Sequence, residues 1–152
     1  IGDQEQAAIA ADARQLGVAD RVTMRGAIPL DQLMPLYPQY DMFVLPTQPG
    51  EGIPRVLLEA MAAGLPVVTT DVSGIRSLVR HGENGVLIAE SSAAALVDGI
   101  TALAEDPSLR RRVIAGGYQT ARAHTLERQA AEMMRAVTQR LGLQLHPVAQ
   151  VA

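Results

Sequence analysis

The chain has 152 residues, of which 48% are hydrophobic and 19% charged, so we expect a folded domain with an aliphatic core. The formal net charge of −3 argues against a nucleic-acid-binding surface, which needs a basic excess. All 13 basic side chains are arginine, and the sequence contains neither lysine nor cysteine. This composition excludes disulfides, thiolate metal sites, lysine Schiff bases and the lysine-containing phosphate loop.

Helix-forming stretches alternate along the chain with short apolar runs of strand length. In order, the sequence predicts a strand end at 1–3, a helix at 4–16, a strand at 22–24, a helix at 30–37, a strand at 41–46, a helix at 54–63, a strand at 66–70, a helix at 74–80, a strand at 86–88, and helices at 92–105, 106–124 and 126–141. Apolar strands that alternate with helices indicate an α/β fold, a Rossmann-like parallel sheet flanked by helices.

Two features are predicted for the last two helices, one exposed and one buried. The run Arg110-Arg111-Arg112 is expected to form the solvated face of a helix. The helix over 126–141 is expected to pack one face in a core, because its apolar residues recur at helical spacing, and packing against a domain outside this chain is kept open. These residues are Ala130, Met133, Met134, Val137 and Leu141.

Residues 46–70 read PTQPGEGIPRVLLEAMAAGLPVVTT and place a glycine-rich loop between a strand and the start of a helix. In an open parallel sheet, ligands bind beyond the carboxyl ends of the strands. The first N–H groups of a helix attract an anion such as a diphosphate. Gly50 and Gly52 would let such a ligand approach the backbone closely.

Two carboxylates flank this predicted anion site. Glu59 is the only charged residue between Val56 and Val68, so it needs hydrogen-bond donors or a wet cleft. It lies about 7.5 Å along the helix axis from Pro54, whereas Glu51 precedes the helix. A ligand with hydroxyl groups on both sides of a diphosphate would match this layout, and a nucleotide sugar is such a ligand.

With these residues in place, the chain resembles the retaining glycosyltransferases of family 4, also called glycosyl transferases group 1. The matching segments are IGD at 1–3, GVADRVTMRGAI at 17–28, YDMFVLPT at 40–47, EGIPRVLLEAMAAGLPVVTTD at 51–71, Gly74-Ile75 and HGENGVLI at 81–88. The resemblance implies the C-terminal half of a GT-B fold, truncated at its N-terminus. It gives a partial donor-binding domain at 1–141 and a C-terminal tail at 142–152.

The resemblance also implies roles for individual residues. Glu51 is expected beside the transferred sugar, where it would assist catalysis, and Glu59 is expected to bind the ribose hydroxyls. Ile28 is expected against the nucleobase, and backbone amides near the helix start are expected to face the sugar and the diphosphate. The substrate-binding residues of that loop and helix start are Gly52, Ile53, Pro54, Arg55 and Val56.

Three departures from the family pattern stand out. Pro54 occupies a position where the family often has glycine, and it removes one amide donor. Arg76-Ser77 stand where the family often reads Pro-Glu. The basic pair that usually neutralises the diphosphate is absent, which fits a chain that has lost its first strands. The start at Ile1 rather than Met likewise predicts a piece of a longer protein.

The resemblance implies transfer of a sugar from a nucleoside-diphosphate sugar donor to a hydroxyl of a glycan or lipid-linked acceptor. No metal, no cofactor and no nucleic acid are expected. The location would be cytoplasmic, with peripheral attachment to the inner face of the membrane kept open. Two alternatives remain: a nucleotide-sugar-binding module or inactive remnant, and a sugar-nucleotide epimerase of the same fold.

The strand order of the family predicts how an isolated chain would fold. The donor sheet of the family has the strand order 3-2-1-4-5-6. In that numbering this chain keeps strands 3, 4, 5 and 6, at residues 22–24, 43–45, 67–69 and 86–88. The strand at 22–24 would then lack its neighbour and should lie outside the sheet, while 42–45 would form a bare edge. We therefore expect the isolated chain to be marginally stable or self-associating, and to have no transferase activity alone.

Overall fold

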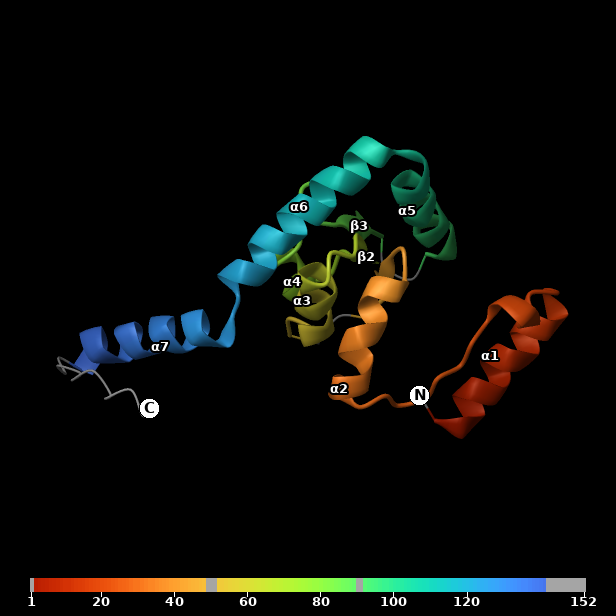
Figure 1. Ribbon diagram of the computed structural model, residues 1–152, viewed down its shortest axis with the longest axis horizontal. Coiled ribbons are helices and arrows are strands. Elements are labelled where there is room, and N and C mark those ends of the chain that lie inside the picture. The colour runs from red at the N-terminus through yellow and green to blue at the C-terminus, as the bar shows by residue number, and fades with distance from the viewer. Residues whose placement is uncertain (1, 49–51, 90–91, 142–152) are drawn as a thin grey trace. The chain divides into compact units, whose positions relative to one another are not determined.

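The computed structural model describes residues 2–48, 52–89 and 92–141, and Glu51 lies outside these ranges (Figure 1). The chain forms two compact units, Ile1–Leu36 and Tyr37–Ala152. The second unit contains the sheet, its covering helices and most of the predicted site residues.

The first unit consists of short helices joined by loops. Its elements are α1 (Asp3–Gln15), the 3₁₀ turn η1 (Ala19–Arg21) and α2 (Leu30–Leu33). Residues 22–24 form no strand, so the strand prediction is wrong, whereas the expectation that this segment lies outside the sheet is confirmed. The run has strand-like composition but pairs with none of the three strands, and its Val22 N–H instead donates to the Ala19 carbonyl of η1.

The predicted helix over 30–37 is also shorter than expected. It changes after Leu33 into the 3₁₀ helix η2 (Met34–Gln39), which leads from the first unit into the second. Pro35 and Pro38 lie in this segment, and proline cannot donate the backbone hydrogen bond that a continued α-helix requires. The 3₁₀ helix buries Tyr37, whose side chain becomes part of the candidate site.

The second unit is built on a parallel three-stranded sheet with the order β1-β2-β3. The strands are β1 (Phe43–Leu45), β2 (Val67–Thr70) and β3 (Val86–Ile88), and Val68 pairs with Val44 on one side and Val86 on the other. Every residue of β2 is buried. The predicted parallel sheet is confirmed, with the last three strands side by side in chain order.

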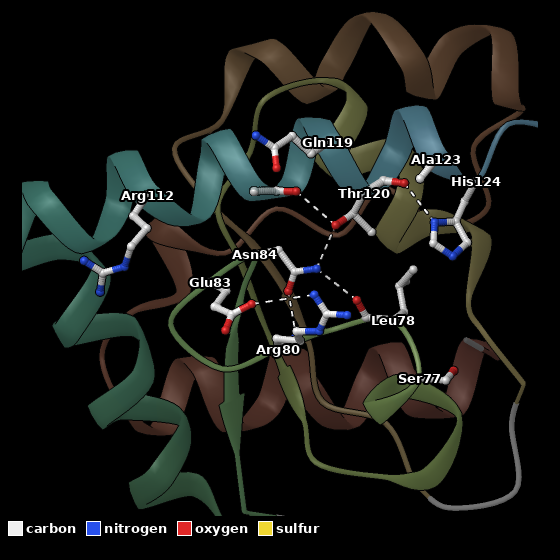
Figure 2. A pocket seen from close by; sticks show the side chains of 11 residues that line it. Ser77, Leu78, Arg80, Glu83, Asn84, Arg112, Gln119, Thr120, Ala123 and His124 are labelled. Atoms are coloured by element: carbon white, nitrogen blue, oxygen red, sulfur yellow. Dashed lines mark hydrogen bonds and ion pairs between the residues drawn. The ribbon is translucent and has the colours of Figure 1, made fainter.

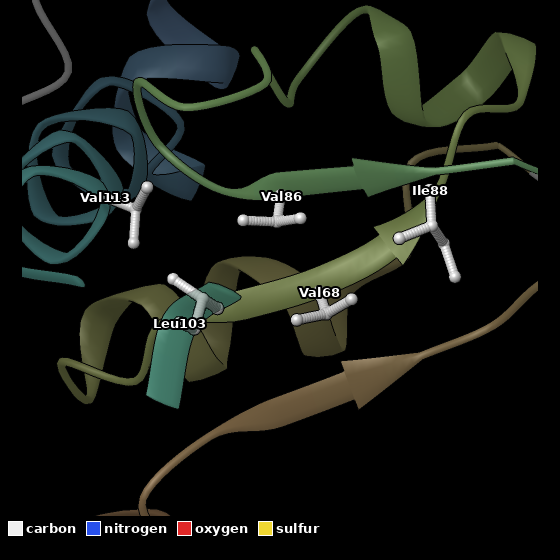
Figure 3. Close-up of a cluster of buried hydrophobic side chains, with 5 residues drawn as sticks. All are labelled: Val68, Val86, Ile88, Leu103 and Val113. Atoms are coloured by element: carbon white, nitrogen blue, oxygen red, sulfur yellow. The ribbon is translucent and has the colours of Figure 1, made fainter. Parts of the chain in front are cut away.

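Helices α5 (Ala93–Glu105) and α6 (Pro107–Ala123) each contribute a residue to the core beside the sheet, and Figure 3 shows the side chains of this core. A buried cluster joins both helices to β2 and β3, and its members are Val68, Val86, Ile88, Leu103 and Val113. Gly99 lets α5 approach closely, because a Cβ built there would lie 2.8 Å from Ile88 and 3.1 Å from Val68. Helix α3 (Arg55–Ala62) and the short helix α4 (Ser73–Arg76) complete the α/β arrangement.

The starts of α5 and α6 show how local sequence sets these helix boundaries. The Ser92 hydroxyl accepts a hydrogen bond from the Ala95 N–H at 3.1 Å. The Asp106 carboxylate accepts from the Ser108 and Leu109 N–H groups at 2.8 and 3.0 Å, and Pro107 occupies the first turn. The hydrogen bonds from Ser108 and Leu109 lower the pKa of Asp106.

A network around Asn84 ties the turn before β3 to α6 (Figure 2). Asn84 is only 7% exposed. Its Oδ1 accepts from the Arg80 N–H at 2.6 Å, and its Nδ2 donates to the Leu78 carbonyl at 2.9 Å and to Thr120 Oγ1 at 2.8 Å. The open cavity of about 470 Å³ beside this network is lined largely by groups that bond one another.

Helix α7 (Leu126–Leu141) corrects a sequence prediction. None of its residues is buried, and Met133 and Leu141 are 65% and 64% exposed. The apolar face of α7 is therefore not packed in the core that the described residues form, and its packing against another domain stays a prediction. The run Arg110-Arg111-Arg112 lies on the outer part of α6, with Arg111 and Arg112 exposed as expected. No helix in the described ranges is both long and apolar enough to cross a membrane.

The Asn84 network predicts a specific loss of stability. Asn84→Ala removes three hydrogen bonds, one of them to the carbonyl of the buried Leu78, so the free energy of unfolding should fall by about 2–4 kcal/mol. Gln119→Ala is the matched control, because Gln119 lines the same cavity but is exposed. Chemical denaturation measures both variants, and equal stability losses would contradict a structural role for Asn84.

Candidate functional site

The candidate site lies at the carboxyl ends of β1 and β2, where the chain leaves the sheet. The buried Thr70 hydroxyl accepts from the Thr47 N–H at 3.0 Å and donates to the Thr47 carbonyl at 2.7 Å. The Thr69 hydroxyl donates to the Leu45 carbonyl at 2.8 Å. Both hydroxyls are thus satisfied, and they fix the start of the loop after β1 to the neighbouring strand.

Helix α3 begins after this loop and buries only part of its surface. Its start is set by Pro54, whose φ of −68° suits a helix entry and whose missing N–H is not needed there. Leu57, Ala60 and Met61 are buried, whereas Arg55 is exposed. The helix therefore buries one face only.

The start of α3 has the electrostatic character of an anion site. The first N–H groups of a helix, here those of Arg55 and Val56, have no acceptor within the helix. No side chain of the described residues caps this end by hydrogen bonding. Gly52 and Ile53 just before the helix are exposed, so a ligand can reach these donors.

Glu59 is half-buried in the second turn of α3, and its carboxylate has a specific partner. The Tyr37 hydroxyl donates to Glu59 Oε2 at 3.1 Å. Burial and the hydrogen bond to Glu59 raise the pKa of Tyr37 to about 12, so the phenol keeps its proton at neutral pH. The expectation that this carboxylate needs a hydrogen-bond donor is confirmed, and the donor is a tyrosine rather than an arginine or the backbone.

Tyr37 was not identified from the sequence. It stands 22 residues before Glu59, in a segment whose prolines indicate only an irregular helix. Its ring is 4% exposed and packs edge-to-face on Phe43, with the ring centres 6.0 Å apart and an angle of 67° between the planes. The signal available was an aromatic residue just before an apolar strand, which is ordinary core composition.

The other predicted residues are distributed as follows. Gly52, Ile53, Pro54, Arg55, Val56 and Glu59 lie together at the start of α3 and in the residues before it. The predicted catalytic residue Glu51 lies outside the described residues. Ile28 belongs to the first unit, where it lines a cavity of about 550 Å³. Within the described ranges, no group of three His, Cys, Asp or Glu residues could hold a metal ion.

An ion pair stands at the same edge of the sheet, just after β2. Arg76 Nε contacts Asp71 Oδ1 at 2.5 Å, and Arg76 Nη2 reaches Asp71 Oδ2 at 3.2 Å. The hydrogen bond from Arg76 lowers the pKa of Asp71. The Asp71 N–H also donates to the Ile88 carbonyl at 2.9 Å, so the pair is tied to the end of β3. Arg76, which departs from the family pattern, is thus engaged with a carboxylate of its own chain.

Comparison with known proteins relates this arrangement to one family. The model of the family described as Glycosyl transferases group 1 matches residues 1–120. The phosphatidyl-myo-inositol mannosyltransferase of Mycobacterium leprae is 39% identical over 95 residues, which cover 62% of this chain and 25% of that protein. The chain spans between 10% and 26% of the length of the first three curated relatives it matches.

Solved structures agree with the fold. Sucrose-phosphate synthase from Thermosynechococcus elongatus superposes with a TM-score of 0.79 at 28% identity, over 91% of this chain and 35% of that one. HepE from Anabaena, in complex with UDP-glucose, superposes with a TM-score of 0.75 at 28% identity, over 90% of this chain and 38% of that one. The family resemblance and the Rossmann-like, GT-B-type fold predicted from the sequence are confirmed.

The threonine contacts predict how the loop after β1 is held. Thr70→Val keeps the side-chain shape but removes both hydrogen bonds to Thr47, so the free energy of unfolding should fall by about 1–3 kcal/mol. The Thr47 amide should also exchange faster with solvent. Thr69→Val is the control, because it removes a bond to Leu45 and leaves Thr47 untouched. Equal exchange at Thr47 in both variants would show that Thr70 does not anchor the loop.

Proposed function

The chain belongs to the glycosyl transferases group 1 family, and we propose that residues 1–141 form the donor-binding part of a retaining glycosyltransferase. The donor is a nucleoside-diphosphate sugar. The acceptor is a hydroxyl of a glycan or a lipid-linked sugar, and the intact protein works in the cytoplasm or at the inner face of the membrane. The tail at 142–152 lies outside this domain.

One observation carries the proposal. The accessible start of α3 offers helix N–H groups to an anion, and the half-buried carboxylate of Glu59 lies one turn further along the same helix. A diphosphate at the helix start would place its nucleoside or its sugar near this carboxylate. The solved structure of HepE holds UDP-glucose, and that of a pneumococcal O-GlcNAc transferase holds UDP and GlcNAc, which supports this class of donor.

The residues suggest an electrostatic mechanism. The helix N–H groups stabilise the diphosphate as negative charge develops on it, and Glu59 holds the ribose. Glu51 lies beside the transferred sugar and orients its hydroxyls. The bond from the sugar to the diphosphate breaks as the acceptor hydroxyl attacks from the same face and passes its proton to the departing diphosphate oxygen, so the anomeric configuration is retained. No metal or cofactor enters this scheme.

The two alternatives, a nucleotide-sugar-binding module and an epimerase, differ from the transferase in the products they release. A module without catalysis would bind the donor but release no nucleoside diphosphate. An epimerase would convert the sugar while it is still attached to the nucleotide, and the family match favours the transferase over it. Incubation of the intact protein with donor and acceptor, followed by product analysis, separates the three functions.

Glu59→Gln tests the ribose-binding role. The amide keeps an acceptor oxygen for Tyr37 but removes the charge, so nucleoside diphosphate should bind the intact protein more weakly by about 1.5–3 kcal/mol. Titration calorimetry measures the affinity. Glu83→Gln provides the control, because Glu83 lies in the turn before β3, at the amino ends of the strands and away from the candidate site. Unchanged affinity with reduced stability would make Glu59 a structural residue.

Glu51→Gln tests the catalytic role. Because Glu51 is proposed to act where charge develops, the variant of the intact protein should lose turnover far more than donor affinity. A fall in kcat of about 100-fold or more, with KM changed by less than about 3-fold, is expected from the loss of a group that acts mainly in the transition state. Steady-state kinetics decides it, and wild-type kcat would leave Glu51 a loop carboxylate.

A further inference from the structure

The contact between Tyr37 and Glu59 has a consequence for ligand recognition. We propose that Tyr37 is a positioning residue, which holds the Glu59 carboxylate in the one orientation that accepts hydrogen bonds from a ribose diol. The inference rests on the proposed function, and it assigns a role to a residue that does not itself touch the ligand.

The geometry of Tyr37 suits this task because its hydroxyl has little freedom. The residue is 4% exposed, and its ring packs against Phe43 of β1. The backbone of η2 and the edge strand therefore determine where the phenol oxygen lies. Its hydrogen bond to Oε2 restrains a glutamate side chain that would otherwise sample several rotamers.

The hydrogen bond leaves most of the carboxylate available. An ionised carboxylate offers about four acceptor positions, and Tyr37 occupies one of them on Oε2. Oε1 and the remaining position on Oε2 can accept from two neighbouring hydroxyl groups. The Tyr37 hydroxyl uses its single proton for the bond to Oε2, so the other acceptor positions of the carboxylate are available to ligand hydroxyls.

A purely structural role explains this pair less well. A half-buried carboxylate loses hydration, and one neutral hydroxyl replaces only part of it. A glutamine at this position of α3 would also accept the hydrogen bond from the phenol, and it would lose less hydration free energy on burial than a carboxylate. A fixed carboxylate that faces solvent one turn beyond an anion-binding helix start is instead pre-organised for a ligand.

Tyr37→Phe isolates this role, because it keeps the ring and the contact with Phe43 and removes only the hydroxyl. Tyr40→Phe is the matched control, since Tyr40 lies three residues later and is 49% exposed. The probes are whichever of UDP, GDP and ADP binds the intact protein most tightly, and the 2′,3′-dideoxy analogue of that diphosphate. Calorimetry gives both affinities, and thermal unfolding gives the stability of each variant.

The wild type and Tyr40→Phe should prefer the ribose form to the dideoxy form. In Tyr37→Phe, affinity for the ribose form should fall by about 3- to 10-fold, the effect of one hydrogen bond, while affinity for the dideoxy form stays unchanged. The preference for ribose should therefore fall by the same factor. A structural role alone would not move this ratio.

The other outcomes overturn the inference in distinguishable ways. If the wild type binds neither probe, the proposed function fails and the inference fails with it. If the wild type prefers ribose and Tyr37→Phe keeps the same preference, the donor site stands but Tyr37 does not position Glu59. If Tyr37→Phe weakens both probes equally, the hydroxyl supports the fold of the site and not its recognition of ribose.

Discussion

Strand β2 is buried along its whole length. The candidate site depends on it, because β2 pairs with β1 and holds the chain that follows β1. Its backbone pairs with β1 and β3, and its valines contribute to the core. Its two threonines reach out of the strand and hold the chain as it leaves β1. The path of the chain from Leu45 to Thr47 is therefore a consequence of burying two hydroxyls that had to find acceptors.

The two ends of the sheet use polar groups differently. Before β3, Asn84 bonds backbone groups of the turn and a side chain of α6. Its amide oxygen and nitrogen thus have their hydrogen-bond partners within the protein. Gly116 allows this close approach, because a Cβ there would lie 2.2 Å from the Glu83 carbonyl oxygen. Beyond β1 and β2, Glu59 has a donor for Oε2 and remains partly exposed. The first end stabilises the fold, and the second retains capacity for a ligand.

In the second unit, most helices and strands form where the local sequence predicts them. Ser92 and Asp106 cap the helices that they were expected to begin, and Pro54 stands at the entry to α3. These signals act within a few residues and need no distant partner. Apolar runs between such boundaries, such as 67–70 and 86–88, could be recognised as strands because β2 and β3 have partners in this chain.

The sequence by itself determined the alternation of strands and helices, the class of fold, and the anionic residues around a helix start. Only the tertiary structure decided which of the predicted surfaces have partners. Residues 22–24 have strand-like composition and join no sheet, and α7 has a helical apolar face with no buried residue. The Tyr37–Glu59 bond joins residues 22 positions apart, and the Asn84–Thr120 bond joins residues 36 positions apart. Periodicity and caps are properties of neighbouring residues, whereas pairing, burial and hydrogen bonding between distant side chains depend on how the whole chain packs.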